Sequence, residues 1–338
     1  MTIFLTSQDV ASLFGMDDYI QAVESAYRGI GEGNTMMVSR IQVDSRQRKG
    51  FLKILPAALW ADDIAGIHAY TGGGGDGFLK LVLLFDAASG NLQALIESDR
   101  IGWLVPGAAS AVATKYLARK DARVVGIFGS GRQARSQLLA LSRVRDISLV
   151  KVFSPEKSHR EKYAADMAKA LDLNVIAVDS PAEAVKGSHI ISVATNAKAP
   201  VFDGSLIEPG THINAIGAHD PARRELDDIC LRRGRVFVDS RDRALQEEGA
   251  LLIPISEGLV NLDLIRGELG DVVAGRKEGR TGGGDITLFF SGAIAPEYVA
   301  VAGAVYRKAR EKGLGLELPQ KRDAEIPSSL YVKKRGPS

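Results

Sequence analysis

The chain has 338 residues, of which 45% are hydrophobic and 25% charged, and its 43 Lys and Arg side chains nearly balance its 41 Asp and Glu side chains. A formal charge of +2 gives no indication of the concentrated basic face that nucleic-acid and membrane-surface proteins need, so neither class is expected. The length predicts two domains at roughly 150 residues each. With 36 glycines and 6% aromatic residues, the composition favours an α/β protein with many tight strand–helix turns.

Cysteine usage and the N-terminal sequence bear on the compartment. Cys230 is the only cysteine, which excludes an internal disulfide and a cysteine-based zinc site; we expect its thiol to be buried. The N-terminus lacks the basic start and apolar run of a signal peptide, and no apolar stretch reaches about 18 residues. We therefore expect a cytoplasmic protein without a membrane span, and the unclustered histidines predict no metal site.

The first third of the chain mixes helices and strands. The stretch Ser7-Gln8-Asp9-Val10 is predicted to open one amphipathic segment with a polar cap, and apolar residues at helical spacing predict a second helix over residues 16–30. Strand patterns follow at 41–43, 50–55, 64–70, 79–85 and 92–97. The glycine-rich residues 71–77 are expected to form a loop.

From residue 123 the pattern alternates between strand and helix. Predicted strands lie at 124–128, 147–153, 175–178, 190–194, 213–216 and 236–238, and predicted helices at 133–143, 159–171 and 181–186. This alternation implies a parallel sheet covered on both faces. We expect an α/β fold: a Rossmann doubly wound parallel sheet domain over residues 117–290, and an α+β domain from residues 1–116 and 291–338. An apolar helix is expected over 291–313, and disorder after 318.

The sharpest motif is a glycine-rich turn between a buried strand and a helix. It has the G-x-G-x-x-A form of a dinucleotide fingerprint in the required context. Its first glycine permits the turn, its second lets a diphosphate approach the backbone, and its alanine allows close helix–strand packing, while the helix N-terminus attracts the anion. The predicted contacts are Gly129, Ser130, Gly131, Arg132, Gln133 and Ala134.

The end of the next strand bears on the choice between NAD and NADP. An NAD enzyme usually has a carboxylate there for the ribose 2′-hydroxyl, whereas this chain has Ser154, followed by Lys157, His159 and Arg160. These groups suit a 2′-phosphate, so NADP is favoured over NAD, although Glu156 argues for NAD. Further cofactor contacts are expected from Thr195 and Gly217, which follow later strands at the carboxyl edge.

Stretches throughout the chain support a family resemblance. They include Ser39-Arg40, Leu55-Pro56-Ala57, Leu83-Leu84-Phe85-Asp86, residues 107–117, Arg224-Glu225-Leu226 and residues 286–289. Together with the glycine-rich turn, they make the chain resemble the ornithine cyclodeaminase/μ-crystallin family over about residues 4–315. The resemblance implies a homodimer whose N-terminal segment and last helix form a substrate and dimerisation domain. It also implies hydride exchange between a nicotinamide and a small amino or imino acid.

Four positions depart from the family pattern in the expected pocket. His68 stands where relatives carry a lysine, Val105-Pro106 replaces an Arg-Thr pair, His219 with Asp220 next to it occupies the slot of an acidic residue, and Tyr298 replaces an aspartate. Arg40 retains the position that the resemblance assigns to the substrate carboxylate, which suits a guanidinium fork. Lys53 is a candidate replacement cation.

The favoured interpretation is a nicotinamide-dependent oxidoreductase. Arg40 would bind the substrate carboxylate, His68 would donate a proton near neutral pH, and Asp220 or His219 would orient a water or the amine. Structural roles stay open for each: a surface arginine, a core histidine and an ordinary turn aspartate. Two other functions also stay open, namely ornithine cyclisation with NAD as an internal hydride acceptor and a non-catalytic nucleotide-binding protein.

Overall fold

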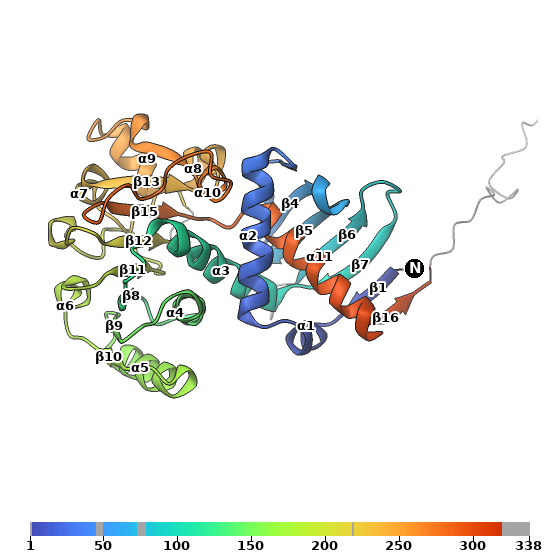
Figure 1. The fold of residues 1–338 in the computed structure, drawn as a ribbon, viewed down its shortest axis with the longest axis horizontal. Helices are drawn as coiled ribbons and strands as arrows, with labels where there is room; N and C mark the ends of the chain where they lie inside the picture. Colours follow the sequence, from blue (N-terminus) through green and yellow to red (C-terminus); the bar gives the residue numbers. More distant parts are fainter. Residues whose placement is uncertain (1, 45–49, 73–78, 218–219, 320–338) are drawn as a thin grey trace, which may run out of the picture.

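The computed structural model describes residues 2–44, 50–72, 79–217 and 220–319, which form two eight-stranded sheets side by side (Figure 1). Most of the loop predicted at 71–77, nearly all of the disorder predicted after residue 318, and His219 lie outside these described residues. Three helices, α2, α3 and α11, occupy the region between and over the two sheets.

The first sheet joins both ends of the chain. Its order is β16-β1-β7-β6-β5-β4-β2, with β3 also pairing with β4, and its pairs are antiparallel except for β1 with β7. The strands are β1 (Thr2–Leu5), β2 (Thr35–Met37), β3 (Ile41–Asp44), β4 (Phe51–Leu59), β5 (Ile64–Gly72), β6 (Lys80–Asp86), β7 (Leu92–Glu97) and β16 (Leu316–Leu318). The short outer strands β1, β2 and β16 were not predicted from the sequence.

Four helices accompany this sheet: α1 (Ser7–Leu13), α2 (Met16–Glu32), α3 (Asp99–Leu117) and α11 (Ala295–Lys312). Helix α11 packs on β4, β5 and β6, where small residues permit close approach: a Cβ at Gly66 would lie 3.0 Å from Val299 Cγ2. The prediction that the last helix begins at 291 was wrong. Pro296 stands in its first turn and Glu297 caps it, so the helix starts at Ala295 and residues 291–294 cross between the two sheets.

The second sheet is wholly parallel, in the order β10-β9-β8-β11-β12-β15-β13-β14. Its first five strands have the Rossmann arrangement, with the chain reversing direction across the sheet at β8, so the predicted fold class is confirmed. The strands are β8 (Val124–Phe128), β9 (Leu149–Phe153), β10 (Val175–Ala177), β11 (Ile190–Val193), β12 (His212–Ala215), β13 (Gly234–Val238), β14 (Ile265–Glu268) and β15 (Ile286–Phe290).

The helices of this half are α4 (Arg132–Val144), α5 (Lys157–Leu171), α6 (Pro181–Val185), α7 (Asp228–Arg233), α8 (Arg241–Glu247), α9 (Gly249–Ser256) and α10 (Leu269–Val273). Helices α4, α5 and α6 were predicted from the sequence. The short helices α7–α10 were not predicted, and neither was α3. Helix α3 is apolar around most of its circumference and packs against α2 and α4, and such a helix lacks the one-sided periodicity on which prediction depends.

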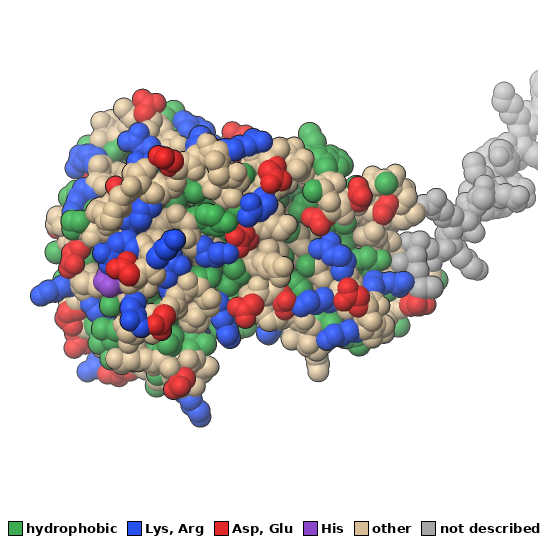
Figure 2. All heavy atoms as spheres, viewed as in Figure 1, with side chains coloured by type: hydrophobic (Ala, Val, Ile, Leu, Met, Phe, Trp, Pro, Cys, Tyr) green, Lys and Arg blue, Asp and Glu red, His purple; other side chains and the backbone are tan. Residues whose placement is uncertain are grey.

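The surface and core agree with the composition. On the face that Figure 2 shows, acidic side chains lie among the basic ones. Cys230 is buried, as predicted. Within the described part of the chain, no helix has the combined length and hydropathy required to cross a bilayer.

Candidate active site at the junction of the two sheets

The glycine-rich turn has the geometry of a diphosphate-binding loop. Gly129 adopts φ = 102°, and a Cβ there would lie 2.4 Å from Ala194 O, so this position requires glycine for the protein's own packing. Gly131 is the N-cap of α4, and a Cβ on it would meet no protein atom within 4 Å. Open backbone at a helix N-terminus is the feature that a diphosphate needs, and the loop therefore fits a dinucleotide.

The remaining loop residues link the turn to its surroundings. Ala134 is fully buried, and its carbonyl accepts a hydrogen bond of 2.8 Å from Tyr163 Oη. The Arg132 guanidinium forms an ion pair with Asp99 and lies 5.1 Å above the Trp103 ring, whose Nε1 donates to Arg132 O at 2.7 Å. Arg132 is thus held against α3, beside the turn.

The end of β9 carries Ser154, which is buried with its Oγ 3.2 Å from Ser130 Oγ. Arg160 is already engaged: it donates to Ser154 O at 3.1 Å and to Asp179 Oδ1 at 2.7 Å. The Lys157 side chain is 68% exposed and lies 3.7 Å from Glu161. Of the two cations predicted to bind the cofactor beyond the end of β9, Lys157 is therefore more accessible to a 2′-phosphate than Arg160.

Thr195 and Gly217 meet at the carboxyl ends of β11 and β12. The Glu225 carboxylate, which is buried, accepts hydrogen bonds from Thr195 N at 2.8 Å and from Thr195 Oγ1. A Cβ on Gly217 would lie 2.3 Å from Glu225 Oε1. Both residues lie at the edge where Rossmann folds bind ligands, but Thr195 also closes this turn through its hydrogen bonds to Glu225, and Gly217 leaves room for the same carboxylate.

A cavity of about 250 Å³ lies between the turn and the first sheet. Its lining comprises Arg40, Lys53, Leu55, His68, Tyr70, Lys80, Gly102, Pro106, Gln133, Gly292, Ala293 and Tyr298. Gln133 belongs to the glycine-rich motif as well as to this lining, so the predicted cofactor loop and the cavity adjoin. The structure brings Arg40 and His68 together here, from positions 28 residues apart in the chain.

His68 lies flat in the wall of the cavity. It is 2% exposed, and its ring stacks on Tyr298 with centroids 4.0 Å apart and lies 5.3 Å from Tyr70. Neither ring nitrogen has a hydrogen-bond partner among the described residues. Burial, with added repulsion from Lys80 and Arg40, lowers the pKa of His68 to about 3. The expectation that His68 donates a proton near neutral pH is therefore corrected, because its imidazole is neutral there.

Arg40 reaches the cavity with part of its guanidinium already bound. Its Nη1 lies 3.3 Å from Glu247 Oε2 and its Nη2 donates to Gly292 O at 3.0 Å. The buried Nε has no partner in the part of the chain that the structure describes. Glu247 and the Gly292 carbonyl fix the orientation of the fork, which is the condition for precise binding of a carboxylate.

The sequence did not predict that three neighbouring strands, β4, β5 and β6, together line the cavity. Lys53, Tyr70 and Lys80 form one cross-strand row over β4, β5 and β6, and Leu55 and His68 form the adjacent row on the same face. Lys80 was not predicted, and Lys53 was only a candidate. Which residues of β4, β5 and β6 lie side by side is set by the strand register. The sequence shows only the alternation of side chains within 64–70 and 79–85, which indicates the face of the sheet on which each residue lies but not its neighbours on the next strand.

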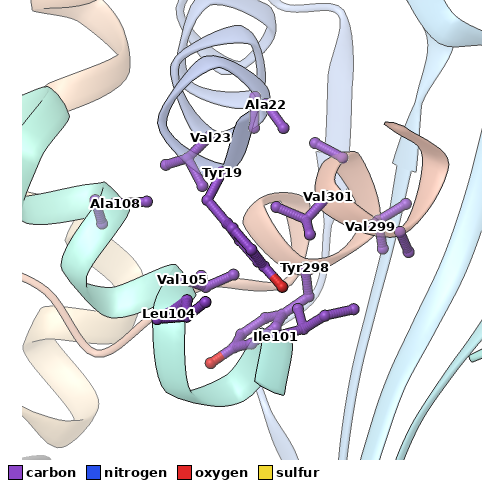
Figure 3. Close-up of a cluster of buried hydrophobic side chains, with 14 of the residues drawn as sticks. Tyr19, Ala22, Val23, Ile101, Leu104, Val105, Ala108, Tyr298, Val299 and Val301 are labelled. Carbon is purple, nitrogen blue, oxygen red and sulfur yellow. The ribbon is translucent and has the colours of Figure 1, made fainter. Parts of the chain in front are cut away.

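The helix α3 supplies the opposite wall. Pro106 has no N–H group, so the Gly102 carbonyl four residues earlier has no helical donor; Gln133 Nε2 lies 3.5 Å from it. Gln133 Oε1 is buried without a partner among the described residues. Val105 does not reach the cavity, because it points into the core where α2, α3 and α11 meet (Figure 3).

Asp220 lies apart from these groups. Its Oδ1 accepts a 2.9 Å hydrogen bond from Ala222 N, and its Oδ2 lies 3.3 Å from Arg223 Nε. This is the arrangement of an Asx turn, and Asp220 is not among the residues that line the cavity. His219 lies outside the described residues. The predicted role of Asp220 at the substrate nitrogen therefore has no support from its position in the structure.

A buried network supports the crossover behind the cavity. The Asp239 carboxylate accepts from Gly292 N at 2.7 Å and from Arg243 Nε at 2.7 Å. Tyr27 Oη donates to Glu297 Oε1, and burial, with Asp239 close by, raises the pKa of Glu297 to about 8. Ala293 has φ = 58°, a strained conformation for a residue with a Cβ. Hydrogen bonds to Asp239 and Glu297 thus hold the crossover, which lines the cavity at Gly292 and Ala293.

A Rossmann sheet with an open diphosphate loop next to an arginine-bearing cavity defines a nicotinamide-dependent oxidoreductase. A family model described as the ornithine cyclodeaminase/mu-crystallin family matches residues 1–313. The chain belongs to this family, as its sequence suggested.

Individual relatives agree over nearly the whole chain. The alanine dehydrogenase of Archaeoglobus fulgidus is 33% identical, over 94% of this chain and 98% of its own. The structure of Thermococcus litoralis Δ1-pyrroline-2-carboxylate reductase with NADH and L-proline is 36% identical, has a TM-score of 0.88, and matches over 94% of this chain and 100% of its own. An archaeal alanine dehydrogenase dimer with bound NAD is 32% identical, with a TM-score of 0.88 over 94% and 99% of the two chains.

These relatives are dehydrogenases and reductases of amino and imino acids. These relatives therefore confirm the class predicted from the sequence: a nicotinamide-dependent oxidoreductase acting on CH–NH or C=N groups. The nicotinamide nucleotides in these two structures are NADH and NAD.

Proposed function

We propose that this chain reduces the C=N bond of a small imino acid, or oxidises the corresponding amino acid, with a nicotinamide nucleotide. The observation that carries the proposal is the position of Gln133, which lies in the dinucleotide motif and also lines the cavity that holds Arg40. The nicotinamide supplies or accepts the hydride. The protein's own groups bind the carboxylate and orient the nitrogen.

A neutral His68 suits a substrate that arrives as an iminium ion. Hydride adds to the carbon of C=NH⁺, the C=N π electrons become the nitrogen lone pair, and the product is a neutral amine without further proton transfer. This step needs hydrogen-bond acceptors at the nitrogen and no general acid. His68, with an unprotonated ring nitrogen, and Gln133 Oε1 are two such acceptors without protein partners among the described residues.

Arg40 is proposed to bind the α-carboxylate. Replacing Arg40 by Lys would lose the planar fork while keeping the charge, so we expect kcat/KM for the best imine to fall by about 100-fold, mainly through KM. Steady-state NAD(P)H oxidation with a panel of cyclic and linear ketimines measures it. Cofactor binding without oxidation of any ketimine would contradict the proposed reduction and support the non-catalytic alternative. Proline formation from ornithine without net NADH change would support cyclisation.

We further propose that NADP is used in preference to NAD. Ser154 offers no carboxylate at the end of β9, and Lys157 is exposed in the first turn of α5. Because Arg160 is bound to Asp179, the preference rests mainly on Lys157. Lys157→Glu should reduce kcat/KM with NADPH by about tenfold while leaving NADH unchanged, and a higher kcat/KM with NADH than with NADPH in the unaltered enzyme would contradict the preference.

A homodimer and a cytoplasmic location complete the proposal. The face of the first sheet opposite α11 carries an apolar groove of about 340 Å³, lined by residues that include Met36, Val38, Trp60, Ile67 and Phe85. Met36, Val38 and Trp60 are all more than half exposed, and such patches mark interfaces. A second copy of the chain is the proposed occupant, in line with the dimeric archaeal relative.

A further inference from the structure

We propose that Lys53 and Lys80 bind a second carboxylate of the substrate, so that the enzyme prefers dicarboxylic over monocarboxylic imino acids. This inference rests on the proposed function and names the substrate class of the same cavity. Three cationic side chains, Arg40, Lys53 and Lys80, come together at this cavity.

The strand register places the two lysines on either side of one aromatic ring. Lys53 pairs with Tyr70 across β4 and β5, and Tyr70 pairs with Lys80 across β5 and β6. Since neighbouring strands lie about 4.8 Å apart, the two lysine backbones are roughly 10 Å apart, with both side chains on the cavity face. A carboxylate placed over Tyr70 is therefore within reach of both flexible ammonium groups.

The cavity lining is positively charged. Arg40, Lys53 and Lys80 all line it, and no Asp or Glu is among the lining residues in the described part of the chain. Glu247 pairs with Arg40 at 3.3 Å and Asp99 with Lys80 at 3.6 Å, both from outside the lining. Lys53 has no ion pair with a described residue. A cavity of this charge favours a ligand with more than one negative group.

Lys53 is partly buried and has a ring, not an anion, as its contact. Burial and the nearby Arg40 lower the pKa of Lys53, and the more weakly acting Glu247 and Asp44 offset this only in part; its ammonium lies 5.1 Å from the centre of the Phe51 ring, in a cation–π contact. A monocarboxylate bound by Arg40 would leave this second cation uncompensated. A dicarboxylic iminium has a net charge of −1, and its distal carboxylate would offset the repulsion between the lysines and the iminium nitrogen.

The test compares two C4 acids of equal length on the NADH-loaded enzyme, using succinate and butyrate in calorimetric titrations at low salt. We expect succinate to bind at least about tenfold more tightly. Lys53→Met should bring succinate to within about threefold of butyrate, while Lys53→Arg keeps the preference. Lys80→Met should reduce it in part, and Lys169→Met, on the exposed surface of α5, is the matched control.

Equal affinities in the unaltered enzyme, or a preference that survives both Lys53→Met and Lys80→Met, would overturn the inference. Turnover separates this inference from the proposed function. Oxidation of NAD(P)H with pyruvate and ammonium but not with oxaloacetate and ammonium would retain imine reduction and refute the dicarboxylate preference. A succinate preference without turnover of any imine would refute the reduction and leave the two-lysine anion site standing.

Discussion

At the scale of single residues, the environment alters what a side chain can do. Among the histidines that the structure describes, two are almost completely buried: His68 in the cavity wall, and His212, whose Nδ1 lies 3.0 Å from Thr287 Oγ1. Burial lowers the pKa of each to about 3. Sequence could place His68 on the inward face of a strand, but its neutral state follows from burial, to which Tyr298 of the last helix contributes, and from repulsion by Lys80 and Arg40 on other segments.

These histidines predict a loss of stability in acid. Below pH 6.5 the unfolded chain binds protons at both positions while the folded chain does not, so the free energy of unfolding falls as pH decreases from 6.5 towards 3. Each histidine contributes a slope of about 1.4 kcal/mol per pH unit. His68→Phe keeps the stacking on Tyr298 and should remove one such slope, as measured by urea unfolding between pH 7.5 and 5. An unchanged slope in this variant would show that His68 titrates normally.

At the scale of elements, the position of helix α3 depends on close packing at a glycine. Helix α3 crosses α4 where a Cβ on Gly107 would lie 2.4 Å from Ser136 Oγ and 2.6 Å from Ser136 O. This contact sets the distance between Pro106 and Gln133, and hence the width of the cavity. The strand–turn–helix at β8 and α4 was predictable because its signals are local, whereas α3 was not, because its apolar residues are buried on most sides.

Gly107→Ala should therefore destabilise the protein by about 1–3 kcal/mol through overpacking. The control is Gly102→Ala on the same helix, where a Cβ would have its nearest contact at 3.6 Å from Lys80 Cδ; this change should be neutral or stabilise slightly, because Ala favours helix. Urea unfolding at pH 7.5 measures both. Equal stabilities of the two variants would contradict the close contact of α3 with α4.

At the scale of the whole molecule, the fold could be predicted from the order of strand and helix patterns, whereas the site forms only when distant segments of the chain come together. Alternating strands and helices predicted the parallel sheet correctly. The cavity draws on β4, β5, β6, α3 and the crossover at 291–294, so no local pattern could join Arg40, Lys53 and Lys80. The family resemblance located Arg40 and His68, while the charge of the cavity emerged only from the strand register.

The open face of the first sheet predicts the oligomeric state. Trp60 is 52% exposed beside the apolar groove, and a charge there would be buried in a dimer at a cost of several kcal/mol. Light scattering should give twice the mass of one chain for the unaltered protein and one chain mass for Trp60→Glu. Leu262→Glu replaces an equally apolar exposed side chain in the other half and should remain dimeric. A monomeric unaltered protein would contradict the proposal.

The central claim is that the turn after β8 binds the diphosphate of a nicotinamide nucleotide, and Gly131 tests it most directly. Because a Cβ there would meet no protein atom within 4 Å, Gly131→Val should leave the midpoint of thermal unfolding within about 2 °C of the unaltered protein. The added side chain would nevertheless block the approach of a diphosphate. Calorimetric titration with NADH and NADPH should show binding to the unaltered protein and at least about a 100-fold loss in the variant. Binding of either nucleotide with the same affinity to both proteins, or no binding to the unaltered protein, would contradict the claim.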